Sequence, residues 1–334
     1  MKRQFGSFVF ALLIASGAQA ATDWPSVNHA LGRTATVQPG EVHRYSFPRS
    51  DLAVTLDGVR IKPALALGSW LAFRDMGDHA EVMGDLVLTQ HEVNPVLSRL
   101  LDGGLTITAL HNHLLRSTPG TVYMHVHGMG DAVRLATTLR YALSASHTPK
   151  TVPRAAASEN LALDTKALDA AMRGQGKVAG GTYQFSFPRA EQVTEDGSPI
   201  PPSLGLATAI NFQPTSKGRA VATGDFVLIA SEVTPVLTEL RRHGIDVTAL
   251  HNHLTGEQPR LFFMHFWGNA DTVSLVSGLR VALDRTNLAP AKRSWNRVVS
   301  WKRVRNSPTI CSGSLPTSMF STRTSACAAL SMAR

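Results

Sequence analysis

The sequence predicts an α+β fold of two tandem repeats, each a ferredoxin-like (split βαβ) unit with extra N-terminal strands. Two observations carry this prediction: several segments recur at a constant offset of 140 residues, and each copy orders its patterns as strand, helix, strand, strand, helix. That order is the split βαβ arrangement. The length of 334 residues agrees with two domains, because a single core rarely grows beyond about 250–300 residues.

The recurring segments define the domain boundaries. Gly-Asp-Leu/Phe-Val-Leu begins at Gly84 and again at Gly224, and Thr-Ala-Leu-His-Asn-His-Leu begins at Thr108 and Thr248. Repeats of this length indicate one structural unit present twice. The predicted parts are a signal peptide at 1–20, repeat 1 at 28–146, a linker at 147–167, repeat 2 at 168–286 and a basic tail at 287–334.

The first elements of each repeat are predicted to be strands. Apolar alternation and flanking turn residues place the first strands at 41–47 and 179–187, the second before turns near 75–78 and 214–218, and the third at 84–90. We interpret the Gly-Asp pair at Gly84 and Gly224 as a turn that enters the third strand.

A helix is predicted to follow in each copy. Asn94 and Thr234 each precede a proline and are expected to cap the helix N-terminus, with Pro95 and Pro235 as the first helical residue. Strands at 105–110 and 121–127 and a helix at 131–143 complete repeat 1, and their counterparts complete repeat 2. We expect the last two strands to form an antiparallel hairpin.

Histidines concentrate on that hairpin. His111 and His113 are two apart on one predicted strand, and His125 and His127 are two apart on the next, so each pair shares a face. Cross-strand neighbours lie roughly 4.5–5.5 Å apart at Cβ, which would let three or four imidazoles converge. Imidazole nitrogen is a ligand for zinc and copper. We therefore predict a divalent transition metal, zinc or copper, at this hairpin.

The second copy keeps most of this set. It has His251, His253 and His265 but carries Trp267 in place of His127. Two other interpretations stay open: a structural polar network, and a metal-free pocket for a small polar ligand.

A glutamate at the start of the first helix recurs in both copies. Glu92 and Glu232 are candidate catalytic residues, as a general base or as a partner that orients an imidazole. The alternative is that each carboxylate only favours the helix N-terminus.

Charge and cysteine content exclude some classes of protein. Eight of the 33 basic residues lie in 287–334, which has no acidic residue, so residues 1–286 carry 25 basic and 24 acidic side chains. A nucleic-acid-binding domain would carry its basic residues on the folded part, so no nucleic-acid partner is expected.

Both cysteines, Cys311 and Cys327, lie in the tail. We expect the tail to be disordered; a shifted reading frame and a basic anchor are the alternatives.

The N-terminal segment has the features of a signal peptide. Lys2 and Arg3 precede an apolar run, and Ala18-Gln19-Ala20 fits a cleavage site after Ala20. A periplasmic or secreted protein without a transmembrane segment is therefore expected.

The motifs together resemble the LppY/LpqO family of bacterial exported proteins, whose function is unassigned. The resemblance is carried by Glu-Val-Asn/Thr-Pro-Val-Leu, Ala-Leu-His-Asn-His and Met-His-x-His/Trp-Gly in both repeats, and it implies an exported protein with no established reaction. We expect a His-rich site in each repeat that binds a divalent metal or a small polar ligand, with metal-assisted hydrolysis as its chemistry. The alternative is a non-catalytic cell-envelope interaction module in which the histidines are structural. The partner would be an unknown small ligand or an envelope component, and the repeats could pack as an intramolecular pseudo-dimer.

Overall fold

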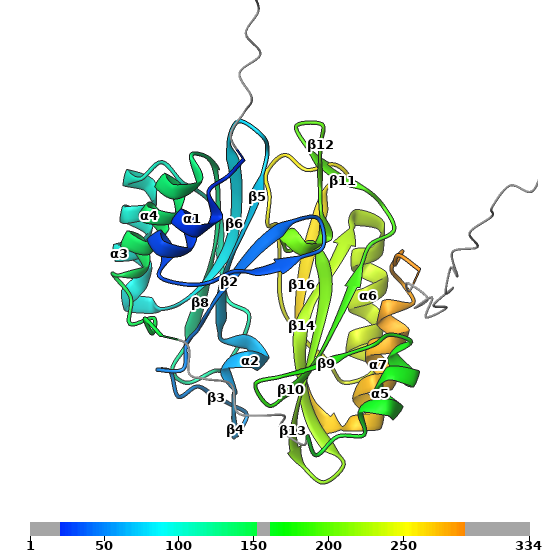
Figure 1. Cartoon of the computed structure of the whole chain (residues 1–334). Coiled ribbons are helices and arrows are strands. Elements are labelled where there is room, and N and C mark those ends of the chain that lie inside the picture. The colour runs from blue at the N-terminus through cyan, green and yellow to red at the C-terminus, as the bar shows by residue number, and fades with distance from the viewer. Residues whose placement is uncertain (1–20, 152–160, 291–334) are drawn as a thin grey trace, which may run out of the picture. The chain divides into compact units, whose positions relative to one another are not determined.

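The computed structural model describes residues 21–151 and 161–290, and these belong to one compact unit (Figure 1). The predicted signal peptide, part of the linker and nearly all of the tail, with both cysteines, lie outside the described residues. The predicted fold class, α+β with two similar tandem domains, is confirmed. Among the described residues no helix is long and apolar enough to span a membrane.

Repeat 1 folds around a six-stranded sheet in the order β1-β2-β5-β6-β8-β7. Its strands are β1 (Thr36–Gln38), β2 (Val42–Pro48), β5 (Gly68–Asp75), β6 (Ala80–Thr89), β7 (Thr106–His111) and β8 (Thr121–Gly130). Its helices are α1 (Trp24–Leu31), α2 (Pro63–Ala66), α3 (Gln90–Asp102) and α4 (Ala132–Leu143), and β3 (Thr55–Leu56) and β4 (Val59–Arg60) form a separate small hairpin.

Repeat 2 has the same architecture, with its sheet in the order β15-β16-β14-β13-β10-β9. Its strands are β9 (Lys177–Ala179), β10 (Thr182–Pro188), β13 (Ala207–Ser216), β14 (Arg219–Ile229), β15 (Asp246–His251) and β16 (Leu261–Asp271). Its helices are α5 (Thr165–Met172), α6 (Ala230–Arg242) and α7 (Thr272–Leu283), and its small hairpin is β11 (Val193–Glu195) with β12 (Ser198–Ile200), followed by the 3₁₀ turn η1 (Pro202–Leu204).

The strand order explains the ferredoxin-like pattern. β8 lies between β6 and β7 and is antiparallel to both, so β6, α3 and β7 form a split βαβ unit. The predicted hairpin of the last two strands is therefore present. β5 pairs with the edge of β6 that faces away from β8. β5 therefore takes the place of the fourth ferredoxin-like strand, although it precedes β6, β7 and β8 in the chain.

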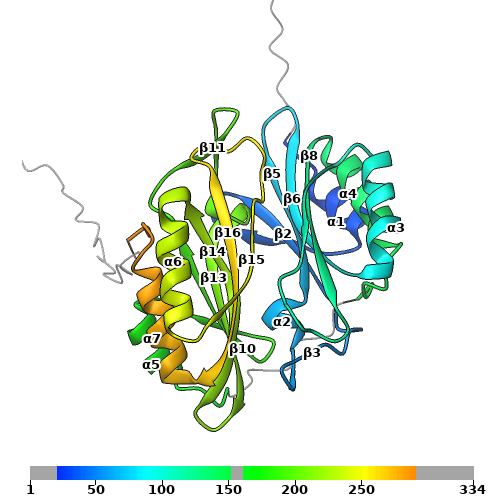
Figure 2. The ribbon, with the colours of Figure 1, turned by 180° about the vertical axis from the view of Figure 1, so that it is seen from behind.

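The two sheets face each other, and the longer helices cover their outer faces, whereas the short α2 lies between the two repeats (Figures 1 and 2). Each repeat has its own core between sheet and helices. Two further apolar clusters combine side chains of both repeats: one includes Met83 and Phe263, and the other includes Tyr123 and Trp267. The two repeats therefore pack against each other.

Hydrogen bonds also cross between the repeats. The Gln213 amide accepts from Lys62 N at 2.9 Å and donates to Arg60 O at 2.8 Å.

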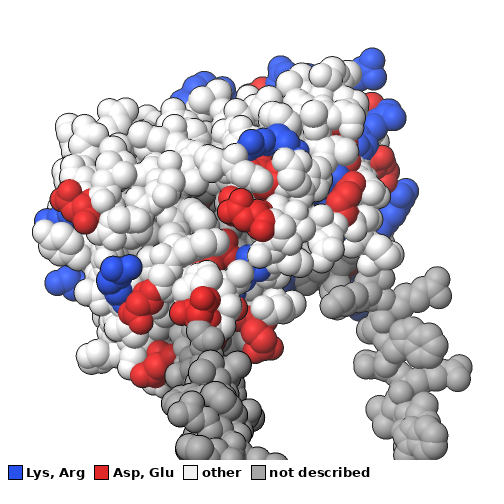
Figure 3. Space-filling model, turned by 90° about the horizontal axis from the view of Figure 1, so that it is seen from above, with Lys and Arg blue, Asp and Glu red and all other residues white. Residues whose placement is uncertain are grey.

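The surface seen in Figure 3 carries charges of both signs between broad uncharged areas. This agrees with the nearly equal numbers of acidic and basic residues in 1–286.

The predicted start of the first helix is wrong in both copies. α3 begins at Gln90, and Pro95 lies inside it, as Pro235 lies inside α6. Thr89 N donates to the Glu92 carboxylate at 2.8 Å, and Ile229 N donates to Glu232 at 3.0 Å. Because these carboxylates satisfy the first backbone donors, each helix begins five residues before its proline.

The prediction of a Gly-Asp turn is also wrong. Gly84 and Asp85 lie within β6, and Gly224 and Asp225 lie within β14. A Cβ on Gly224 would lie 1.9 Å from Ala209 O of the neighbouring strand, so glycine permits the close approach of β13 and β14. The glycine thus serves strand packing, and the aspartate projects from a strand.

The end of repeat 2 extends past the boundary predicted at residue 286. Leu288 bridges to Arg189, and Ala190 N donates to Asn287 O at 2.9 Å. The residues at 287–290 therefore belong to the fold of repeat 2.

Candidate metal centre

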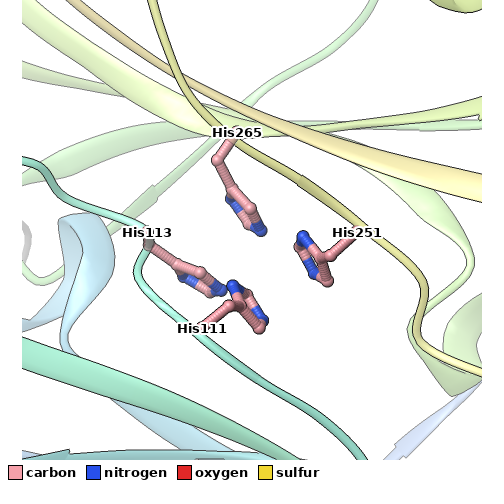
Figure 4. Close-up of side chains that lie close together, drawn as sticks. All are labelled: His111, His113, His251 and His265. Carbon is pink, nitrogen blue, oxygen red and sulfur yellow. The ribbon is translucent and has the colours of Figure 1, made fainter.

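Six histidines, three from each repeat, come together between the two sheets. Figure 4 shows four of these rings pointing toward one another, two from each repeat. We call the six the histidine cluster: His111, His113 and His125 from repeat 1, and His251, His253 and His265 from repeat 2. The sequence predicted a site in each repeat, whereas the structure forms one cluster from both.

Strand pairing positions the repeat 1 histidines. His111 is the last residue of β7 and pairs with Tyr123 of β8, two residues before His125. His113 lies beyond the end of β7 rather than on it, and its ring stacks on Tyr123 with centroids 3.5 Å apart. The Tyr123 hydroxyl donates to Ala66 O at 2.9 Å, which fixes the ring that supports His113.

Repeat 2 builds the same arrangement. His251 is the last residue of β15 and pairs with Phe263 of β16. The ring of His253 stacks on Phe263 at 3.4 Å between centroids. The hairpins of the two repeats therefore present their histidines in equivalent ways.

Contacts between the repeats are the shortest in the cluster. The ring centroids of His111 and His251 are 3.5 Å apart, and those of His113 and His265 are 3.6 Å apart. The third pair, His125 and His253, is at 3.9 Å. Each repeat 1 histidine thus lies against a repeat 2 histidine, in three pairs.

Eight ring nitrogens of the cluster are buried and have no hydrogen-bond partner among the described residues. They are Nε2 of all six histidines, together with Nδ1 of His251 and His253. A buried polar atom without a partner costs about 1–3 kcal/mol, and such groups are rare in folded proteins. An ion that accepts these lone pairs would remove the cost.

Backbone groups contact the rings of three histidines. His265 Nδ1 lies 3.0 Å from Gly224 O, and His111 Nδ1 lies 3.5 Å from Asn112 O. The Gly84 backbone forms a hydrogen bond with His125. An Nδ1–H donated to a carbonyl leaves Nε2 with a free lone pair, which is the tautomer that metal-bound histidines adopt.

Two aspartates adjoin the cluster, the buried Asp85 and the half-buried Asp225, and the sequence prediction missed both. Asp85 pairs with His125 across β6 and β8, and Asp225 pairs with His265 across β14 and β16. Asp85 lies 3.7 Å from His113 Nε2 and 3.9 Å from His125 Nε2. Their position in the middle of apolar strands, in both copies, was the sequence signal that could have identified them.

Burial sets the protonation state of these groups. Desolvation lowers the pKa of His111 to about 4 and that of His251 to about 3, and it lowers the pKa values of the other four histidines well below the usual range. The same burial raises the pKa of Asp225 to about 7 and that of Asp85 well above its usual range. At neutral pH the cluster therefore offers neutral imidazoles, the form that binds metal.

His127, predicted as a fourth ligand, lies in another group of residues. Its Nε2 is 3.2 Å from Glu81 Oε1 and 4.0 Å from Glu195 Oε2 of repeat 2. Burial lowers the pKa of His127, but Glu81 and Glu195 outweigh this and raise it. At the equivalent position Trp267 Nε1 donates to Asp57 at 3.0 Å. Both side chains thus contact the small hairpin of the other repeat.

Glu92 and Glu232, the predicted catalytic residues, bond to buried arginines. Arg49 Nη1 donates to Glu92 Oε2 at 2.8 Å, and Arg189 forms the same ion pair with Glu232. Glu92 also accepts from His147 N at 2.7 Å. These contacts tie the helix start to the strands and to the end of each repeat.

The chain has low similarity to solved structures of bacterial microcompartment shell proteins. These include the trimeric shell protein PduB (TM-score 0.22, 11% identity, covering 78% of this chain and 99% of that one). EtuB from Clostridium kluyveri has a TM-score of 0.19 and 10% identity, covering 75% of this chain and 89% of that one. MSM0271, a double-ringed trimeric shell protein, has a TM-score of 0.18 and 11% identity over 63% of this chain and 83% of that one. No curated protein matches the chain.

These comparisons correct several expectations. The structures they find are described as shell proteins and not as exported or metal-binding proteins, so they give no support to the predicted function of an exported protein with one metal or small-ligand site per repeat and hydrolytic chemistry. The envelope-module alternative and the periplasmic or secreted location lose their support with it, and the predicted signal peptide lies outside the described residues. At these TM-scores the neighbours lend no function of their own to the chain.

The family comparison corrects the predicted LppY/LpqO membership. The model that matches carries the description Domain of Unknown Function (DUF1259), and it matches residues 25–145 and 166–285. Both stretches fall on the two repeats, and nothing in the comparisons indicates LppY/LpqO. The chain therefore belongs to the family described as Domain of Unknown Function (DUF1259), of which it carries two tandem copies.

Proposed function

We propose that this protein binds a transition metal, zinc or copper, in a single centre that the two repeats form together. One observation carries the proposal: the buried Nε2 atoms of six histidines have no hydrogen-bond partner among the described residues, and the ligand atoms of these histidines lie within 4.8 Å of one another in two overlapping groups that draw on both repeats. Imidazole is a preferred ligand of zinc and copper, and the lowered pKa values keep these rings neutral and able to bind.

The bound ion would also join the repeats. Because each closest histidine pair takes one ring from each repeat, coordination would cross-link the two sheets. An ion that binds the folded state and not the unfolded chain adds to stability by mass action.

Metal binding by the full chain tests the proposal. Demetallated protein is titrated with Zn(II) and with copper, and bound metal is measured after gel filtration. Two triple variants remove the ligands of one repeat each: His111→Gln/His113→Gln/His125→Gln and His251→Gln/His253→Gln/His265→Gln. His91→Gln is the matched control, because His91 is exposed on α3. Circular dichroism shows whether each variant folds.

We expect stoichiometric metal in the wild type and in His91→Gln, and loss of tight binding in both triple variants. A site confined to each repeat would instead leave half of the metal in each triple variant. Absence of metal from the folded wild type with both metals would overturn the proposal and leave the histidines as packing between the repeats.

A further inference from the structure

We propose that the histidine cluster is a two-ion centre, with two positions that each take ligands from both repeats and with aspartates between them. This inference rests on the proposed function, because it specifies how many ions the shared centre holds and how the ligands divide.

The histidines divide into two sets by the distances between ligand atoms. The atoms of His111, His113, His251 and His265 lie within 4.8 Å of one another, and so do those of His125, His251 and His253. Two nitrogens bound to one zinc ion at about 2.0–2.1 Å can be at most about 4.2 Å apart. Each set is therefore close to the size of one coordination sphere. We name them the first position and the second position.

One ion cannot use the whole cluster, because zinc is almost always four-coordinate and the cluster offers six histidines and two aspartates. The ligand atoms of His113 and His125, which belong to different sets, also lie within 4.8 Å of each other in a group with Asp85, so the two sets meet at Asp85. Each position is centred on a pair that spans the repeats: His113 with His265 at 3.6 Å, and His125 with His253 at 3.9 Å. His251 belongs to both sets and lies between the positions.

Asp85 is placed to bridge the two positions. Its Oδ2 lies 3.7 Å from His113 Nε2, and its Oδ1 lies 3.9 Å from His125 Nε2. These separations are too long for hydrogen bonds, but they suit two ligands of one ion, with bonds of about 2.0–2.2 Å each. One carboxylate oxygen thus faces each position.

Asp225 occupies the equivalent place on the other side. It lies 3.9 Å from His253 Nε2 and 4.0 Å from His265 Nε2, and these histidines again belong to different positions. Its contacts run through Oδ2, while Oδ1 is buried and has no partner among the described residues. Carboxylates that link paired ions are typical of sites with two metals about 3.5–4 Å apart.

Charge favours copper in the fully loaded centre. If the incoming ions displace the protons of both aspartates, six neutral imidazoles and two carboxylates carry a charge of −2, which two Cu(I) ions neutralise. Two Zn(II) ions would leave a charge of +2 in a buried site, and buried charge without compensation is costly. Imidazole suits copper as well as zinc. The centre thus favours a pair of cuprous ions.

The test counts the Cu(I) ions that the full chain binds under anaerobic conditions. Competition with a chelator of known affinity measures this number. His113→Gln/His265→Gln removes the pair at the first position, and His125→Gln/His253→Gln removes the pair at the second. His91→Gln is again the control, and circular dichroism verifies folding. We expect two Cu(I) ions in the wild type and the control, and one in each double variant.

The outcomes separate this inference from the proposed function. One metal ion per wild-type chain, whether Cu(I) or zinc, would overturn the two-ion centre and leave a shared metal site standing. Loss of both ions in either double variant would also overturn it, because the positions would not be separate. No metal of any kind would overturn both proposals.

Discussion

Single residues in this protein distinguish the histidine cluster, which is the candidate metal centre, from the structural ion pairs. Glu92 and the histidines recur in both repeats, so repetition alone does not tell ligands from packing residues. Burial and partners do. The Glu92 carboxylate has an ion pair and backbone donors, whereas the histidine Nε2 atoms have no partner among the described residues.

We predict that Glu92→Gln destabilises the protein and leaves metal binding unchanged. The substitution leaves the fully buried Arg49 guanidinium with Asp51 as its only carboxylate partner among the described residues, beside its hydrogen bond to Val87 O. Breaking a buried ion pair costs about 3–5 kcal/mol, and urea denaturation measures it. Glu41→Gln, at an exposed position, is the control. A marked loss of metal affinity in Glu92→Gln would instead support the role in the site that the sequence predicted.

The contribution of Glu92 is expected to depend on pH. Burial raises its pKa, but hydrogen bonds from Arg49 and from backbone amides outweigh this and lower the pKa to about 2. Because the folded pKa lies below the unfolded value of about 4.3, the stabilisation is fully present above that value and is lost as the pH falls toward 2. The difference in unfolding free energy between wild type and Glu92→Gln should therefore shrink across this range. A difference that stays constant from pH 6 to pH 3 would contradict it.

At the scale of helices and strands, local sequence patterns predict the β7–β8 hairpin but not the start of α3. The β7–β8 hairpin was predictable because apolar and polar residues alternate over several positions. The start of α3 was not, since the local Asn-Pro pattern competes with the Glu92 cap and its ion pair to Arg49, a contact 43 residues away. Asp85 was missed because Gly-Asp is typical of turns, and nothing local marks Gly84 as a close approach between strands.

The contact between the histidines of the two repeats could not be predicted from the sequence, for a different reason. The periodicity of one hairpin places its histidines on one face, but it does not say what that face packs against. The pairing of His111 with His251 depends on how two sheets meet. Six of the seven histidines predicted as ligands lie in the cluster. The seventh, His127, was included only because of its spacing from His125, and it lies with Glu81 and Glu195 instead.

At the element scale we predict that Gly224→Ala destabilises repeat 2. The added Cβ would lie 1.9 Å from Ala209 O, a backbone atom that cannot rotate away. β13 and β14 must separate, which by analogy with overpacked cores costs about 1–3 kcal/mol. Thermal unfolding measures the loss. Gly68→Ala is the matched control, because its Cβ would meet only Pro63 O at 3.9 Å. Equal melting temperatures for the two variants would refute the close approach.

At the scale of the whole molecule, the histidine cluster makes the contact between the repeats sensitive to acid. The mixed apolar clusters and the six histidines lie between the same two sheets. Protonation of several imidazoles there would place like charges within a few ångströms of one another. In the metal-free protein these imidazoles therefore bind protons less readily in the folded state than in the unfolded chain.

We predict that the metal-free protein loses stability as the pH falls below about 6.5, the usual pKa of histidine. The pKa values of the six clustered histidines are lowered by burial, to about 4 for His111 and about 3 for His251, so the unfolded chain binds more protons between these limits. Stability is then present above about 6.5 and is lost as the pH falls. Asp85, Asp225 and His127, with raised pKa values, act in the opposite direction but are fewer.

Unfolding free energies of the demetallated full chain from pH 7.5 to pH 5 measure this effect. The triple variant His111→Gln/His113→Gln/His125→Gln is expected to lose less stability over the same range, because it lacks three of the titrating groups. Metal should raise stability most at pH 7.5, since protons compete with the ion for imidazole nitrogen at lower pH. A wild type whose metal-free stability is the same at both pH values would show that the six rings are not held neutral in the folded protein.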